Sequence, residues 1–186
     1  MQPELTTSLL GGTYEDQILV LEKLNSLSKN EWIIVAKENQ SQTHYQRNPF
    51  FFERLKGLKN VFFLKRSEDT DEFLNKSDMI ATICGTIGFE GLIKSKKCLV
   101  FGQAWYTNIH GVLKISNSTD EKQINDFFYN QFDKTKFLND LKKLLSTCDK
   151  GVISSNYEFM VDNFDKNVNC SQIINNLNKF IEKNFE

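Results

Sequence analysis

Four loops of this 186-residue chain carry residue types that can bind a phosphate or a sugar hydroxyl. They are the segment around Gly11 and Gly12, and residues 38–47, 85–90 and 102–111. The last three follow short apolar runs that are typical of buried strands. Ligands of open parallel sheets bind beyond the carboxyl ends of the strands. We therefore expect a ligand site where these loops meet.

The loop at residues 85–90 (GTIGFE) is the sharpest candidate for a phosphate site. Gly85 and Gly88 let backbone N–H groups approach a ligand closely, and the helix predicted behind them presents unpaired N–H groups and a partial positive charge. Thr86 can cap this helix or donate to a phosphate oxygen, and Glu90 can accept from a ribose hydroxyl. The alternative is structural: a tight turn with a threonine cap and a glutamate that the helix dipole favours.

Gly11 and Gly12 precede the first predicted helix and offer the same backbone chemistry in a less specific pattern. The segment is not a P-loop, because no Gly-Lys-Ser/Thr follows, and it is not a Gly-x-Gly-x-x-Gly fingerprint. It predicts only that the backbone can come close to a ligand.

Lys37 and Glu38 stand at the end of the strand predicted at residues 32–37. A lysine at this place can balance phosphate charge, and a glutamate can accept from a sugar hydroxyl. The alternative is a solvated charge pair of the kind that is common on protein surfaces.

The histidines and cysteines form no recognisable catalytic or metal-binding pattern. They are widely spaced, without a Cys-x-x-Cys pair or a Ser/His/Asp arrangement, so we expect no metal and two solvated histidines. Two of the thiols lie in apolar runs, which favours buried, reduced cysteines and a cytoplasmic protein, with peripheral attachment at the inner face of the membrane as a further location. The residues concerned are His44, His110, Cys84, Cys98, Cys148 and Cys170.

Composition narrows the classes of protein further. The chain has 23 Lys and Arg against 24 Asp and Glu, a net charge of -1, which excludes a strongly basic nucleic-acid binder. Its 40% hydrophobic content, with 16 Phe, is sufficient for a core. No apolar run reaches the roughly 18–20 residues of a membrane helix, and no signal-peptide pattern opens the chain.

Short apolar runs alternate with amphipathic stretches along the first two thirds of the chain. This order predicts an α/β fold, with a Rossmann-like parallel sheet of about five strands, helices on both faces and a helical C-terminal tail. We expect one domain over residues 1–186, with an opening loop at 1–14, an α/β core at 15–118 and a mainly helical part at 119–186. The predicted strands are residues 32–37, 61–64, 79–84, 98–101 and 112–115, and the predicted helices are residues 15–27, 50–56, 71–75, 89–95, 120–130, 134–147 and 171–185.

An ordered set of short segments runs from residue 2 to about residue 115. The segments are Gln2-Pro3-Glu4, Thr6-Thr7, Gly11-Gly12, Asp16-Gln17, Lys37-Glu38, Asn60-Val61, Ser77-Asp78, Ala81-Thr82-Ile83, Gly85-Thr86-Ile87-Gly88-Phe89-Glu90, Lys96-Lys97-Cys98, Phe101-Gly102, Trp105-Tyr106 and Gly111-Val112. Together they resemble the C-terminal half of bacterial capsule polysaccharide biosynthesis proteins. The resemblance rests on the order and spacing of the set rather than on any single motif.

The resemblance implies the donor-binding half of a GT-B-type glycosyltransferase, in a family that includes Kdo transferases. It implies a nucleotide-sugar donor, CMP- or UDP-linked, as substrate, with no other cofactor. It places the nucleotide against Lys37 and Glu38 and against residues 85–90. Trp105 and Tyr106 would stack on the base or close the cleft.

A GT-B enzyme needs two Rossmann-like domains that face one cleft. By the resemblance, the acceptor half and the catalytic base belong to an N-terminal domain or a partner chain, and the acceptor is a glycan or glycolipid. We therefore expect this polypeptide alone not to transfer sugar, and the catalytic residues are not assigned.

Two departures from the family pattern bear on function. Asn39-Gln40 replaces a His-Pro pair, which affects donor identity and activity, and Lys96-Lys97 replaces Lys-Pro. Two alternatives therefore stay open. One is half of a sugar-nucleotide epimerase or polyol-phosphate transferase, and the other is a non-enzymatic interaction module of a capsule-assembly complex.

Overall fold

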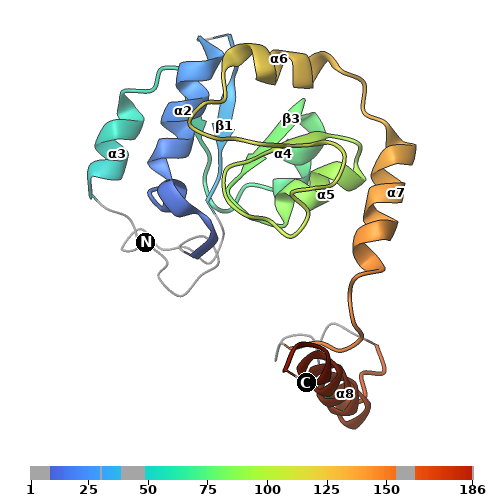
Figure 1. Ribbon diagram of the computed structural model, residues 1–186. Coiled ribbons are helices and arrows are strands. Elements are labelled where there is room, and N and C mark those ends of the chain that lie inside the picture. The colour runs from blue at the N-terminus through green and yellow to red at the C-terminus, as the bar shows by residue number, and fades with distance from the viewer. Residues whose placement is uncertain (1–8, 30, 39–48, 154–161, 186) are drawn as a thin grey trace. The chain divides into compact units, whose positions relative to one another are not determined.

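The computed structural model describes residues 9–29, 31–38, 49–153 and 162–185 and shows an α/β protein. It divides into two compact units, Met1–Leu138 and Asn139–Glu186. All the described strands lie in the first unit (Figure 1). Part of the segment expected to be mainly helical, residues 119–186, contributes to the core of the first unit, where Ile124 is fully buried.

The described strands are parallel, as expected, but they form two separate hydrogen-bonded sheets. One contains β1 (Ile34–Ala36) and β2 (Val61–Phe63), and the other has the order β3 (Met79–Thr82), β4 (Lys97–Val100) and β5 (Val112–Lys114). The prediction of one sheet of about five strands is therefore wrong in this detail. The two sheets meet through side chains, because Ile34 and Leu99 belong to the same hydrophobic cluster.

Each predicted helix is present in the described residues, with ends shifted by a few residues. The first begins at Ile18 rather than at Glu15, because Gly12–Glu15 forms a separate 3-10 turn, η1. The α-helices are α2 (Ile18–Ser28), α3 (Pro49–Lys56), α4 (Thr70–Lys76), α5 (Ile87–Ile93), α6 (Glu121–Tyr129), α7 (Lys134–Leu145) and α8 (Lys166–Phe185).

Strand β4 is buried on both faces, which is typical of a central parallel strand. Successive side chains of a strand point to opposite faces. Leu99 belongs to the cluster that contains Leu24 of α2 and Ile124 of α6, while Cys98 lies against Gly88 of α5. Helices therefore cover β4 from both sides.

Asn60 joins the end of α2 to the start of both strands in the smaller sheet. Its side-chain Nδ2 donates to Ser28 Oγ at 2.8 Å and to the Trp32 carbonyl at 3.0 Å. Its backbone carbonyl accepts from Ile34 N at 2.9 Å. Asn60, through its side chain and its backbone together, thus fixes where β1 begins relative to β2.

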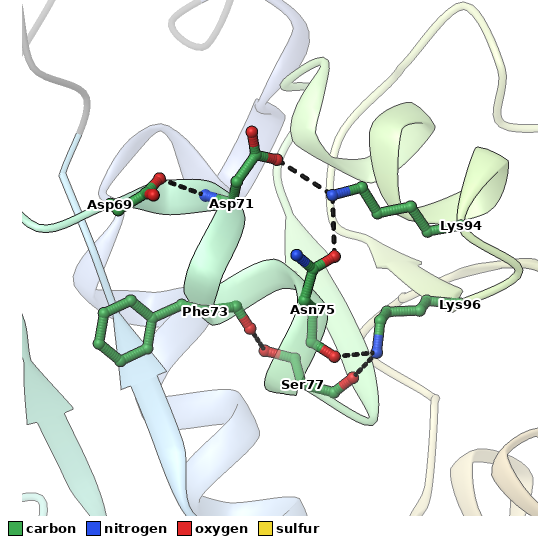
Figure 2. A network of polar contacts seen from close by, with 7 residues as sticks. All are labelled: Asp69, Asp71, Phe73, Asn75, Ser77, Lys94 and Lys96. Carbon is green, nitrogen blue, oxygen red and sulfur yellow. Dashed lines mark hydrogen bonds and ion pairs between the residues drawn. The ribbon is translucent and has the colours of Figure 1, made fainter.

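A polar network at the amino-terminal edge of β3 and β4 holds α4 in place (Figure 2). Lys94 Nζ donates to Asp71 Oδ1 at 3.1 Å and to Asn75 Oδ1 at 2.9 Å. Lys96 Nζ donates to the Asn75 carbonyl at 2.9 Å and to the Ser77 carbonyl. Since cations interact favourably with the carbonyl end of a helix, Lys96 stabilises the C-terminal end of α4. Lys94 joins side chains of the first and last turns of α4 to the end of α5.

Lys97, the first residue of β4, caps a second helix. Its buried ammonium group donates to the carbonyls of Phe127 at 2.5 Å, Phe128 at 2.8 Å and Asn130 at the end of α6. Burial lowers the pKa of the Lys97 ammonium group. Three hydrogen bonds to carbonyls compensate for removing this charge from water.

The second unit consists of the end of α7, a connecting segment and α8. Asn169 of α8 holds the segment before it, because its Oδ1 accepts from Val152 N at 2.8 Å and its Nδ2 donates to the Val152 carbonyl at 3.0 Å. Within the described residues, α8 has no buried side chain. No helix in the described ranges is long and apolar enough to cross a membrane.

We predict that Lys97→Met lowers the free energy of unfolding by about 1.5–3 kcal/mol, the usual loss for hydrogen bonds made by a charged group. The substitution keeps the apolar stem and leaves the α6 carbonyls without their donor. Urea unfolding followed by circular dichroism measures the change. Lys122→Met, at an exposed position of α6, is the matched control, and equal losses in both variants would contradict the capping role.

Candidate functional site

Backbone hydrogen bonds join three of the four predicted loops at the carboxyl edge of the larger sheet. The β3–β4 pairing continues past the strands, where Gly102 N donates to the Ile83 carbonyl at 2.8 Å. Gln103 N donates to the Leu10 carbonyl at 2.9 Å, which brings in the opening segment. The Tyr106 hydroxyl donates to the Gly85 carbonyl. The loops that contain Gly11, Gly85 and Gly102 are therefore neighbours, and the last two follow β3 and β4 as predicted.

The opening segment has the compact backbone that its two glycines predict. Gly12 has φ +56, a left-handed conformation that favours glycine, and an added Cβ would meet no atom within 4 Å. Gly11 is buried, and its carbonyl accepts from Tyr14 N at 3.0 Å. The Tyr14 ring packs edge-on against Phe101 with the centroids 4.9 Å apart. This packing holds the segment on the end of β4.

Arg54 of α3 ties η1 and α2 together. Its Nε and Nη2 donate to the two carboxylate oxygens of Glu22 at 2.7 and 2.5 Å, and its Nη1 donates to Asp16 Oδ2 at 2.8 Å. A bidentate guanidinium–carboxylate pair is directional as well as strong, so Glu22 orients the Arg54 guanidinium. The same guanidinium then holds Asp16, the residue immediately after η1.

An open hollow of about 500 Å³ lies between the opening segment and the ends of β4 and β5. Two predicted site residues, Gly11 and Gly12, line it. The other wall is formed by polar residues that were not predicted, Lys114, Ser116 and Asn117, although their position at the end of the strand predicted at 112–115 was a usable signal. The lining residues are Leu9, Leu10, Gly11, Gly12, Thr13, Tyr14, Phe101, Gly102, Gln103, Lys114, Ser116 and Asn117.

Lys23 of α2 shapes the far wall of this hollow. Its Nζ donates to the carbonyls of Asn117 at 3.2 Å and Thr119 at 3.0 Å. Ser116 N donates to Thr119 Oγ1 at 2.9 Å and closes the turn. The polar turn after β5 is thus fastened to the helix that also contacts β1.

The backbone donors of the 85–90 loop are arranged differently from the predicted phosphate cradle. Gly85 N donates to Thr82 Oγ1 at 3.1 Å, and Gly88 N donates to the Gly85 carbonyl at 3.3 Å. Both glycine N–H groups therefore already have acceptors within the turn. The predicted phosphate cradle is wrong for these two groups, because backbone donors pair within the protein wherever an acceptor is near.

Thr86 and Glu90 are the exposed predicted side chains of this loop. Thr86 is the N-cap residue of α5, but it makes no side-chain capping hydrogen bond in the described structure because its backbone is helical, with φ -63 and ψ -23. The structure therefore does not show the predicted capping role of the Thr86 hydroxyl. Its donation to a phosphate oxygen stays a prediction. Glu90 lies in the first turn of α5.

Tyr106 and Gly88 lie beneath the turn rather than on its surface. Tyr106 is fully buried, and a Cβ added at Gly88 would lie 2.3 Å from its hydroxyl oxygen and 2.7 Å from Cys98 Sγ. The predicted stacking of Tyr106 on a base does not agree with this burial. Tyr106 instead supports the turn through its hydrogen bond to Gly85. Burial raises the pKa of both the Tyr106 hydroxyl and the Cys98 thiol, the latter to about 12.

Lys37 and Glu38 follow β1, at the carboxyl end of the smaller sheet, as expected. Glu38 is 9% exposed and Lys37 is partly exposed. The hydrogen bonds that join the loops of Gly11, Gly85 and Gly102 do not involve Lys37 or Glu38. Asn39 and Gln40 lie outside the described residues.

Of the two histidines, only His110 lies within the described residues. His110 has a structural partner, because its Nε2 accepts from Asp133 N at 2.9 Å and its ring packs against Phe132 with the centroids 5.4 Å apart. His44 lies outside the described residues. No disulfide bond joins the cysteines of the described residues, and Cys148 and Cys170 are exposed. Among the described residues, no three His, Cys, Asp or Glu side chains gather as metal ligands do.

Parallel sheets covered by helices define an α/β domain, and the carboxyl edge of such a sheet is the usual place for a ligand. The family described as capsule polysaccharide biosynthesis protein matches residues 29–148, more than half of the chain. The chain belongs to this family, which supports a role in capsule polysaccharide synthesis. The match includes every predicted site residue except Gly11 and Gly12. Comparison with curated proteins and with solved structures gave no match.

The burial of Cys98 predicts a pH dependence of stability. Its pKa is about 12 in the folded chain against an ordinary value of 9.0, so the folded state holds a proton that the unfolded state releases. The contribution is complete below pH 9.0 and is lost as the pH rises towards 12, by up to about 1.4 kcal/mol per pH unit. Urea unfolding at several alkaline pH values measures this slope.

Cys98→Ala removes the titrating thiol, so the decline of its unfolding free energy with pH is expected to be shallower. Cys148→Ala, at an exposed thiol, is the control and keeps the wild-type slope. Identical slopes in all three proteins would contradict the burial of Cys98.

Proposed function

We propose that this chain is the donor-binding domain of a glycosyltransferase for capsule or surface polysaccharide synthesis. Its ligand is a nucleotide sugar, CMP- or UDP-linked. The observation that carries the proposal is the meeting of three predicted loops at the carboxyl edge of the larger sheet, two of which, those of Gly11 and Gly102, also line the hollow. This edge is where parallel α/β sheets bind their ligands.

In this proposal, three side chains of the loops each contact a different part of the nucleotide sugar. The exposed Thr86 hydroxyl donates to a phosphate oxygen. The Glu90 carboxylate accepts from a ribose or sugar hydroxyl. Lys37 balances the charge of the leaving nucleotide as the glycosidic bond breaks.

Sugar transfer needs a second domain in this proposal. An N-terminal GT-B domain or a partner chain supplies the acceptor side and the catalytic base, and the acceptor is a glycan or a glycolipid. The complex works in the cytoplasm, at the inner face of the membrane, where a lipid-linked acceptor is within reach. This chain alone binds donor and does not turn it over.

The strongest competing function is a non-enzymatic interaction module of a capsule-assembly complex. The exchange of a family His-Pro pair for Asn39-Gln40 favours this alternative. It predicts that partner proteins bind the chain and that nucleotides do not. A second alternative is that the chain is half of a sugar-nucleotide epimerase or a polyol-phosphate transferase. In that case the chain binds a nucleotide, but the complete enzyme forms a product other than a transferred sugar.

Calorimetric titration of the full chain with CMP, CDP, UMP and UDP tests the proposal. We expect saturable binding of at least one nucleotide to the wild-type chain. Thr86→Ala and Glu90→Ala each lose one hydrogen bond to the ligand, so each is expected to weaken binding by roughly 2- to 10-fold.

Thr135→Ala and Glu53→Ala, at exposed positions of α7 and α3, are the matched controls and keep wild-type affinity. If none of the four nucleotides binds at millimolar concentration, the donor-site proposal fails. If the Thr86 and Glu90 variants bind as tightly as the controls, the ligand lies elsewhere.

A further inference from the structure

The two neighbouring aromatic residues of the 102–111 loop have opposite environments. Tyr106 is 0% exposed and donates to Gly85, whereas Trp105 is 53% exposed. The buried residue therefore fastens the loop to the turn beneath it. The exposed residue is carried on the surface beside the same turn.

Trp105 is held in place although more than half of its side chain faces solvent. Its ring centroid lies 4.6 Å from that of Phe89 and 5.3 Å from that of Tyr106. The backbone that carries it is closed by Thr107, whose Oγ1 accepts from Ala104 N at 3.0 Å and donates to the Ala104 carbonyl at 2.6 Å. Because these contacts already restrict the Trp105 side chain, ligand binding costs little of its conformational entropy.

The position of Trp105 connects it to the proposed donor site. Phe89, its closest aromatic contact, lies in the first turn of α5 between Gly88 and Glu90. The ring therefore lies next to the helix turn that presents Glu90, the proposed acceptor for a ribose hydroxyl. In a nucleotide the base is joined directly to that ribose, so a base lies within reach of a side chain next to Glu90.

We propose that Trp105 is the base-stacking residue of this chain and that the donor is recognised through an aromatic nucleobase. The inference rests on the proposed function and adds to it the side chain that recognises the base of the nucleotide sugar. A large, rigid indole ring stacks on any base with little hydrogen-bond selectivity. Tyr106 acts as a positioning residue that holds Trp105 against the turn.

Two substitutions of similar apolar character separate stacking from simple packing. Trp105→Phe keeps an aromatic face, and Trp105→Leu keeps only apolar bulk. By the usual contribution of stacking, we expect Trp105→Leu to weaken the binding of UDP or CMP by roughly 5- to 150-fold. Trp105→Phe is expected to keep most of the affinity.

Fluorescence provides an independent readout, because the chain has 2 Trp residues, Trp32 and Trp105. In a Trp32→Phe chain the emission comes from Trp105 alone, and a stacked base is expected to quench it in a saturable way. Circular dichroism and urea unfolding of each variant show whether it is folded.

The outcomes separate this inference from the proposed function. Weaker binding by folded Trp105→Leu, rescue by Trp105→Phe and quenching of Trp105 together support it. If both variants bind UDP and CMP like the wild type, or lose affinity equally, the inference is overturned while the donor site stands. If the wild-type chain binds neither nucleotide, both proposals fail together.

Discussion

The region around the candidate site depends on how closely α5 approaches the larger sheet. Gly88 and Gly91 face the sheet, where a Cβ would lie 2.7 Å from Cys98 Sγ and 2.8 Å from Ile80 Cγ1 respectively. Without side chains at these positions, the helix lies near enough for the Tyr106 hydroxyl to reach the Gly85 carbonyl. That hydrogen bond brings the 102–111 loop to the 85–90 loop, and the site follows from it.

Lysines at the opposite edge of the sheet complete the scaffold. Lys94 and Lys96 bind the end of α4, and Lys97 binds the end of α6. Lys97 supplies a side-chain ammonium donor to three carbonyls at the end of α6. The amino-terminal edge is thus occupied by helix capping, which leaves the carboxyl edge as the place for exposed polar loops.

The helices, strands and loop positions were predictable because they depend on local patterns. Apart from the 3-10 turn η1, periodic apolar residues and turn glycines placed the described helices and strands to within a few residues. The rule for parallel sheets placed the loops containing Gly85 and Gly102 at one edge. The roles of individual groups were less predictable. Tyr106 and Trp105 are adjacent and aromatic, and nothing local distinguishes a buried ring from an exposed one. Lys114, Ser116 and Asn117 carry no motif and join the hollow only through folding.

The sequence by itself determined the α/β class, the order of its elements and the family to which residues 29–148 belong. These properties follow from periodicity and ordered motifs, which exist before the chain folds. Only the tertiary structure decided that the strands pair in two sheets, that the glycine N–H groups of the 85–90 loop are already bonded, and that Trp105 is the exposed ring beside it. The physical reason is that hydrogen-bond partners and burial depend on residues far apart in the chain, such as Tyr106 and Gly85.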